Sequence, residues 1–186
     1  MKNPLGGNQE NADSVPRYLL FKETMEFHLS GKSRYGFRHM HPLLAELVRS
    51  LPTVIEPDTL SDAAEQRFYP APTTAGDLDD LRADWKAFVE PGLHEQFRSA
   101  RDIVATDLKS LTEKKDLFEL TIPVKHADAW LNVLNQARLA LAADLGFDEE
   151  LLSAQEPPDL ASDRGLAAFR INLYAFMQQC LIDQME

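Results

Sequence analysis

The sequence has almost no cysteine and no long apolar run. Cys180 is the only cysteine among the 186 residues, which excludes an internal disulfide and a thiolate metal cluster and favours a compartment that keeps thiols reduced. No window approaches 18 consecutive apolar residues, and residues 1–14 contain no apolar segment after their lysine, which argues against a membrane span and a secretion signal. We therefore expect a cytoplasmic protein that contacts no membrane.

Positive charge is also scarce. Nineteen Lys and Arg face thirty Asp and Glu, so the formal net charge is −11 and the pI is near 4.9. This balance argues against nucleic-acid binding by the whole surface, because such binding depends on Lys and Arg that neutralise phosphates. The charge is uneven: residues 1–52 carry a net +2 and residues 53–186 a net −13. The acidity belongs to the part with helical patterning.

The remaining composition, 44% apolar and 26% charged residues, is typical of a globular domain with its own core. Residues 1–14 are rich in Gly and Asn and poor in apolar residues, as in a disordered leader. We predict a single mainly helical domain over residues 15–186. Its fold class is mainly α, a helical bundle with a small antiparallel β-sheet near the N-terminus.

The sheet is predicted from short β-favouring runs. They are RYLLF at 17–21, MEFHL at 25–29 and YGFRHM at 35–40, and Gly31 suits the turn of a hairpin between the last two. FELTIPV at 118–124 alternates and is bounded by charge and Pro123, which predicts an edge strand that completes this sheet.

The helices are predicted from apolar residues at three- and four-residue spacing. Pro42 suits a first helical position with His41 held outside the helix, and Pro52 should end that helix. The further segments are about 61–68, 78–89 up to an interruption at Pro91, 93–111 ending near 114–115, 130–145 with Gly146 as its stop, and 166–181.

A basic stretch crosses the predicted hairpin and is interleaved with aromatic residues. Its members are Arg17, Lys22, Lys32, Arg34 and Arg38. This composition is typical of a nucleic-acid contact surface. The simpler interpretation, which we favour, is an ordinary short sheet whose basic side faces water or the acidic helices.

Two arginines lie near the apolar arcs of the last two helices, Arg138 and Arg170. An arginine there must reach water or meet a carboxylate, because an unpaired buried charge is very costly. Asn135 lies one turn before Arg138, so the two could bind a ligand together, although we favour a structural role for both. Leu139 falls opposite the main stripe, where it is either a tolerated exposed leucine or the contact of another helix or subunit.

Other patterns give little chemistry. His39 and His41 have no third ligand at matching spacing, and the acidic cluster at 77–84 lacks the glycine and terminal glutamate of a calcium loop. No phosphate-binding or dinucleotide-binding glycine motif occurs. Cys180 lies on an apolar arc and should be a packed thiol. We therefore predict no metal, no cofactor and no catalytic residue.

The segment AWLNVLNQARLALAADLGF at 129–147 resembles the W-L-x-x-L-N-x-x-R-L-x-L pattern of an uncharacterised bacterial family, domain-of-unknown-function family two-thousand-seventeen. RFYPAP at 67–72 and LYAFMQQCLIDQ at 173–184 extend the similarity over about residues 40–186. The residues that match the pattern are Trp130, Leu131, Leu134, Asn135, Arg138, Leu139 and Gly146. Gln136 and Phe176 depart from it, where the family usually has an acidic residue and often a tryptophan.

The resemblance implies a cytoplasmic, mainly helical bacterial protein with a regulatory role and no agreed activity. With the absence of a catalytic pattern, it leads to our leading hypothesis: a regulatory or adaptor-like protein that acts through protein–protein contacts, as a homodimer or with another partner. The alternative is a transcriptional regulator that contacts DNA through residues 17–38.

Overall fold

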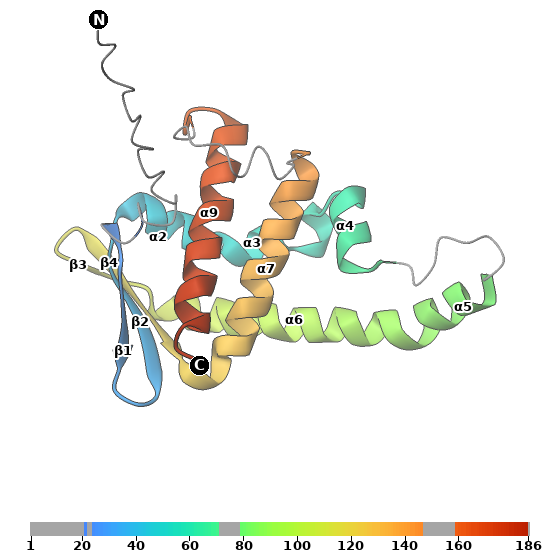
Figure 1. Cartoon of the computed structure of the whole chain (residues 1–186), viewed down its shortest axis with the longest axis horizontal. Coiled ribbons are helices and arrows are strands. Elements are labelled where there is room, and N and C mark those ends of the chain that lie inside the picture. Colours follow the sequence, from blue (N-terminus) through green and yellow to red (C-terminus); the bar gives the residue numbers. More distant parts are fainter. Residues whose placement is uncertain (1–20, 22–23, 71–78, 147–158, 186) are drawn as a thin grey trace, which may run out of the picture.

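The computed structural model describes residues 21, 24–70, 79–146 and 159–185. The predicted leader at 1–14 lies outside these residues. Helices make up most of the described chain, and a four-stranded antiparallel sheet lies at one end of the molecule (Figure 1). The predicted fold class, mainly α with a small antiparallel sheet near the N-terminus, is confirmed.

The sheet consists of β1 (Glu26–Ser30), β2 (Arg34–Met40), β3 (Thr112–Lys114) and β4 (Leu117–Pro123), in the order β1-β2-β4-β3. The predicted hairpin is β1–β2, and Gly31 in its turn has a φ of 68°. The first β-favouring run is not a strand where it is described, because Phe21 is helical.

The segment predicted as an edge strand is central. β4 pairs with β2 on one side and with β3 on the other, so β3 forms the edge. β3 was missed because Lys114 and Lys115 suit the end of a helix. Instead Lys115 and Asp116 adopt φ angles of 52° and 66° in the tight turn between β3 and β4.

Alternation along the strands separates the two faces of the sheet. The inner face buries aromatic and aliphatic side chains in the core, namely Tyr35, Phe37, Leu120 and Ile122. The outer face carries the polar alternates, and on it the ring of His28 lies across Gly36, where a Cβ would fall within 3 Å of three ring atoms.

Three short helices follow β2 in the chain. They are α2 (Pro42–Arg49), α3 (Leu51–Val54) and α4 (Asp62–Phe68), and the 3-10 turn η1 (Pro57–Thr59) lies before α4. Pro42 is the first residue of α2, as predicted, and His41 Nδ1 accepts a hydrogen bond from the Leu43 backbone N–H at 3.2 Å. Pro52 does not end the helical path. It is the second residue of α3. A backbone N–H at this position has no partner within the helix, so the missing N–H of proline breaks no hydrogen bond.

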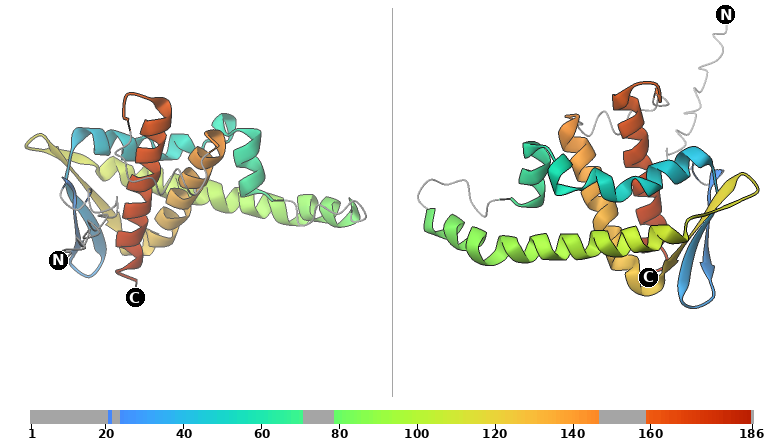
Figure 2. Two further views of the ribbon diagram at one scale, coloured as in Figure 1. Left: turned by 45° about the horizontal axis from the view of Figure 1, so that its top comes forward. Right: turned by 180° about the vertical axis from the view of Figure 1, so that it is seen from behind.

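One long helical path forms an arm. It comprises α5 (Asp79–Asp84), the π-helical turn η2 (Trp85–Val89) and α6 (Glu90–Asp107), followed by the 3-10 turn η3 (Leu108–Ser110). Pro91 was predicted to interrupt this helical path, but it lies inside α6 and does not. Proline lacks an N–H and clashes with the preceding turn of an α-helix, and the wider π turn directly before Pro91 accommodates it. The α5 end projects well beyond the rest of the described molecule (Figures 1 and 2).

The 3-10 turn η4 (Val124–His126) leads into α7 (Ala127–Asp144), which packs against α9 (Asp163–Ile182) in the centre of the molecule (Figure 1). Trp130, Leu134 and Met177 are completely buried there. Gly146 follows α7 with a φ of 59°, as predicted for a helix stop. No helix in the described part of the chain is both long and apolar enough to cross a membrane.

Candidate functional site

The arm presents an apolar stripe to solvent. Leu81, Phe88 and Val89 are 47%, 79% and 40% exposed, and half-buried Trp85 lies between them. Leu81, Trp85 and Val89 recur every four residues, which keeps them on one side of the helical path. The spacing that predicted a helix at 78–89 therefore belongs to a face that the described chain leaves uncovered.

Acidic side chains border this stripe. Asp80 and Asp84 are exposed along the same helical path. Exposed carboxylates beside an apolar stripe favour a partner that carries positive charge around an apolar contact. We call Leu81, Phe88 and Val89 with these two carboxylates the arm surface.

A cavity of about 480 Å³ lies at the base of the arm, between α6 and the segment from α3 to α4. Its apolar walls include Phe68 and Phe97, whose rings meet edge to face at a centroid distance of 6.2 Å. Tyr69 and His94 stack on each other at 3.9 Å and also border the cavity. This volume lies in the range of small-molecule sites.

Two polar side chains with low exposure also line the cavity. The Arg101 guanidinium donates to the Ile55 carbonyl oxygen at 3.3 Å and lies 3.6 Å from Glu56 Oε1. Gln136 reaches the cavity from α7, and its Nε2 donates to Asn132 Oδ1 at 2.6 Å. Burial raises the pKa of Tyr69, Glu65 and Glu90 raise it further, and nearby Arg101 opposes this shift.

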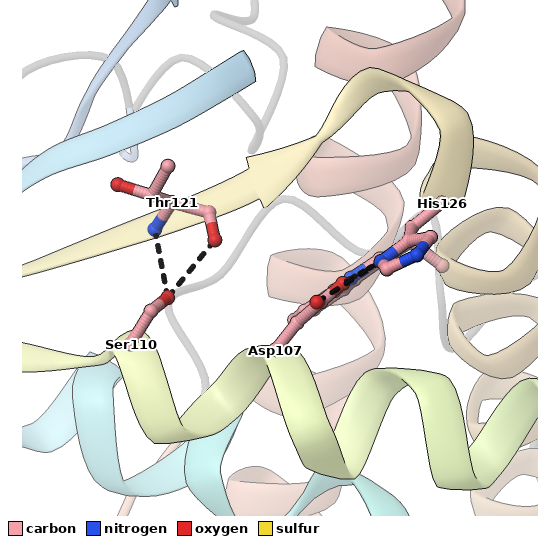
Figure 3. Close-up of polar contacts among 5 residues, drawn as sticks. Asp107, Ser110, Thr121 and His126 are labelled. Atoms are coloured by element: carbon pink, nitrogen blue, oxygen red, sulfur yellow. Dashed lines mark hydrogen bonds and ion pairs between the residues drawn. The ribbon is translucent and has the colours of Figure 1, made fainter. Parts of the chain in front are cut away.

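A buried carboxylate joins the end of α6 to the start of α7. His126 Nδ1 lies 3.0 and 2.9 Å from the two carboxylate oxygens of Asp107, and Trp130 Nε1 donates to Asp107 Oδ2 at 2.9 Å. Nearby, Ser110 Oγ donates to the Thr121 carbonyl oxygen and accepts from its backbone N–H (Figure 3). The Asp107 contacts with His126 and Trp130 join α6 to the start of α7.

The two predicted arginines lie in different places, and neither meets a carboxylate in the described part of the chain. Arg138 donates to Gln178 Oε1 at 2.5 Å, and burial lowers the pKa of its guanidinium. Arg170 donates to Ser50 Oγ at 3.3 Å. Within the described residues, neutral amide and hydroxyl oxygens of neighbouring elements are the acceptors, and a pairing with a carboxylate stays a prediction.

The other predicted site residues do not converge with them. Asn135 is exposed, and no hydrogen bond within the described ranges joins it to Arg138. Leu139 is half-buried and packs against the core. Cys180 is half-buried and also packs against the core.

The basic stretch is partly described. Lys32, Arg34 and Arg38 are exposed on the β1–β2 hairpin, whereas Arg17 and Lys22 lie outside the described residues. Carboxylates share this part of the sheet. Glu26 lies opposite Arg38 in the register, and hydrogen bonding by Lys114, with nearby Arg38, lowers the pKa of Glu119.

The two patterns considered and rejected as metal sites have other roles. His39 pairs with Glu26 at 3.3 Å, and His41 caps α2. Asp80 lies in the first turn of α5, where negative charge suits a helix N-terminus, and Asp77 lies outside the described residues. Within the ranges that the structure describes, no three His, Cys, Asp or Glu residues gather as metal ligands.

Sequence reasoning missed the residues that line the cavity. Phe97 and Arg101 fall within the helix predicted at 93–111, and neither was singled out as a site residue. Lys86, Glu90, His94, Phe97 and Arg101 recur at three- and four-residue spacing and line the cavity together. That spacing was the available signal, although it does not show that α4 and α7 close the cavity.

A family model described as a domain of unknown function (DUF2017) matches residues 26–185. No curated protein and no solved structure matches the chain.

Proposed function

Because the chain belongs to the DUF2017 family, whose description assigns no function, we propose its role from the arm: a cytoplasmic, adaptor-like protein that binds another protein without catalysis. The observation that carries the proposal is the exposed apolar stripe on a projecting helix. Large apolar patches on soluble proteins mark interaction sites. Covering Phe88 alone would contribute up to about 2–3 kcal/mol to association.

The proposed partner presents an apolar contact surrounded by lysine or arginine. Asp80 and Asp84 provide the complementary charge on the arm surface. A second copy is less favourable, because it brings a chain with the same net charge of −11 against this acidic border. The homodimer is therefore an alternative outcome of the test.

The test compares Phe88→Asp with Leu29→Asp. Leu29 is an exposed leucine on β1, in the sheet and away from the arm. Each purified chain is immobilised and used to capture proteins from the cell of origin, and a photo-crosslinking residue at position 84 identifies direct contacts. The proposal predicts a basic protein that wild type and Leu29→Asp retain, that Phe88→Asp loses, and that high salt releases.

An identical set of captured proteins for wild type and Phe88→Asp would contradict the proposal. A stable dimer of the wild-type chain in light scattering, abolished by Phe88→Asp, would replace the basic partner with a second copy. Contact with DNA is not proposed, because Glu26 and Glu119 lie among the described basic residues of the sheet.

A further inference from the structure

The polar groups of the cavity at the base of the arm have unused hydrogen-bonding capacity. Gln136 is only 5% exposed, and in the described part of the chain no donor reaches its Oε1. The Arg101 side chain is 16% exposed, and its two contacts, at 3.3 and 3.6 Å, are both long. A guanidinium has five N–H donors, so several remain for a ligand.

Two carboxylates, Glu90 and Glu95, also line the cavity, but each lies beside a partner of its own, His94 and Arg98. Arg101 and Gln136 therefore define the chemistry of a ligand. A guanidinium shielded from water binds a carboxylate through paired, charge-assisted hydrogen bonds. The Gln136 Oε1 acceptor requires an O–H or N–H donor on the ligand. The rings of Phe68 and Phe97 form apolar walls that suit an aromatic body.

We propose that this cavity binds a small aromatic carboxylate. Its carboxylate pairs with Arg101, its ring packs against Phe68 and Phe97, and its O–H or N–H group donates to Gln136. This site is separate from the arm surface, because Phe88 lies two positions from both Lys86 and Glu90, which line the cavity. Residues two apart on a helix do not face the same side.

The probes are 4-hydroxyphenylacetate, phenylacetate and 4-hydroxyphenylacetamide. The second lacks the hydroxyl group and the third lacks the negative charge. Binding to the full chain is measured by NMR titration at low salt. We expect 4-hydroxyphenylacetate to bind with a millimolar or tighter Kd, to shift resonances of Phe68, Tyr69 and Phe97, and to bind at least about tenfold more tightly than the amide.

Three variants assign the contacts. Arg101→Gln should weaken 4-hydroxyphenylacetate about tenfold or more and leave the amide unchanged. Gln136→Leu should remove the preference for 4-hydroxyphenylacetate over phenylacetate. Glu56→Gln should strengthen carboxylate binding several-fold, because it removes the negative charge 3.6 Å from Arg101 and keeps every guanidinium donor.

Glu56→Gln distinguishes a ligand site from a structural ion pair, since a purely structural Arg101 predicts no gain in affinity. Arg49→Gln, on the exposed side of α2, is the matched control and should bind as wild type. Thermal unfolding of each variant verifies its fold. The proposal is overturned if neither 4-hydroxyphenylacetate nor phenylacetate shifts the cavity resonances at 10 mM, which is about the weakest Kd expected of ligands this small. It is also overturned if 4-hydroxyphenylacetamide binds as tightly as 4-hydroxyphenylacetate.

Discussion

The arm and the α7–α9 pair carry the same kind of sequence pattern and have opposite surroundings. In α7, Trp130, Leu134 and Ala137 recur at helical spacing and are completely buried by neighbouring elements. In the arm, Leu81, Trp85 and Val89 recur at similar spacing, yet Leu81 and Val89 remain exposed. Periodicity thus shows that a helix has an apolar face, but it does not show whether other elements of the same chain pack against that face.

Replacing one leucine in each region gives the largest expected difference. Leu134→Ala removes a completely buried side chain, leaves a cavity and should lower the free energy of unfolding by about 2–5 kcal/mol. Leu81→Ala should change it by less than about 0.5 kcal/mol, since Leu81 is exposed. Urea unfolding monitored by tryptophan fluorescence measures both variants. A large loss for Leu81→Ala would show that the isolated chain already covers the arm.

The buried tyrosine of α9 gives the next largest effect. Tyr174 donates to the Leu47 carbonyl oxygen at 2.9 Å, and burial raises its pKa from 10.0 to about 12. The folded chain therefore retains this proton where the unfolded chain loses it. The stabilisation is complete below pH 10 and disappears as the pH rises from 10 to 12, a loss of about 2–3 kcal/mol.

Urea unfolding at pH 9.5 and 11.5 tests this expectation, with Tyr174→Phe as the reference because it lacks the titrating group. Wild type should lose more of its unfolding free energy than Tyr174→Phe between these two values. Equal losses would mean that Tyr174 titrates normally in the folded chain. Arg170 opposes the rise in the pKa of Tyr174, so Arg170→Gln should enlarge that rise.

Two glycines give the smallest contrast. Gly146 ends α7 with a positive φ, so Gly146→Ala should destabilise the chain by about 1 kcal/mol. Gly92 lies within α6, and a Cβ there would meet nothing within 4 Å. Gly92→Ala should therefore stabilise the chain by up to about 1 kcal/mol. Thermal unfolding gives the two signs, and a loss for Gly92→Ala would indicate a close contact at the base of the arm.

Much of the fold could be predicted from local signals. Pro42 with His41 marked the start of α2, Gly31 marked the hairpin turn, and Gly146 marked the end of α7. The errors arose where non-local packing decides the structure. β4 is central because β3 pairs with it, and nothing in the alternation of residues 118–124 reveals that additional partner.

The candidate site could be predicted less well. The helical spacing at 78–89 was recognised, but the exposure of the stripe depends on packing in space, where no element of the described residues covers it. Arg138 and Arg170 were recognised as constrained, yet their acceptors, Gln178 and Ser50, come from α9 and from the residue between α2 and α3. Arg101 and Gln136 line one cavity only because α6 and α7 pack together, so no local pattern joins them.

The π turn at Trp85–Val89 has a geometric consequence for the arm. It contains one residue more per turn than an α-helix, and the Glu90 N–H bonds to the Trp85 carbonyl oxygen across it. Removing one residue, such as Ala87, would restore α geometry and rotate α5 about the helix axis by about 100° relative to α6. The extra residue therefore sets the angle, about the helix axis, between two faces of the arm. One is the exposed apolar face of α5, and the other is the face of α6 that lines the cavity.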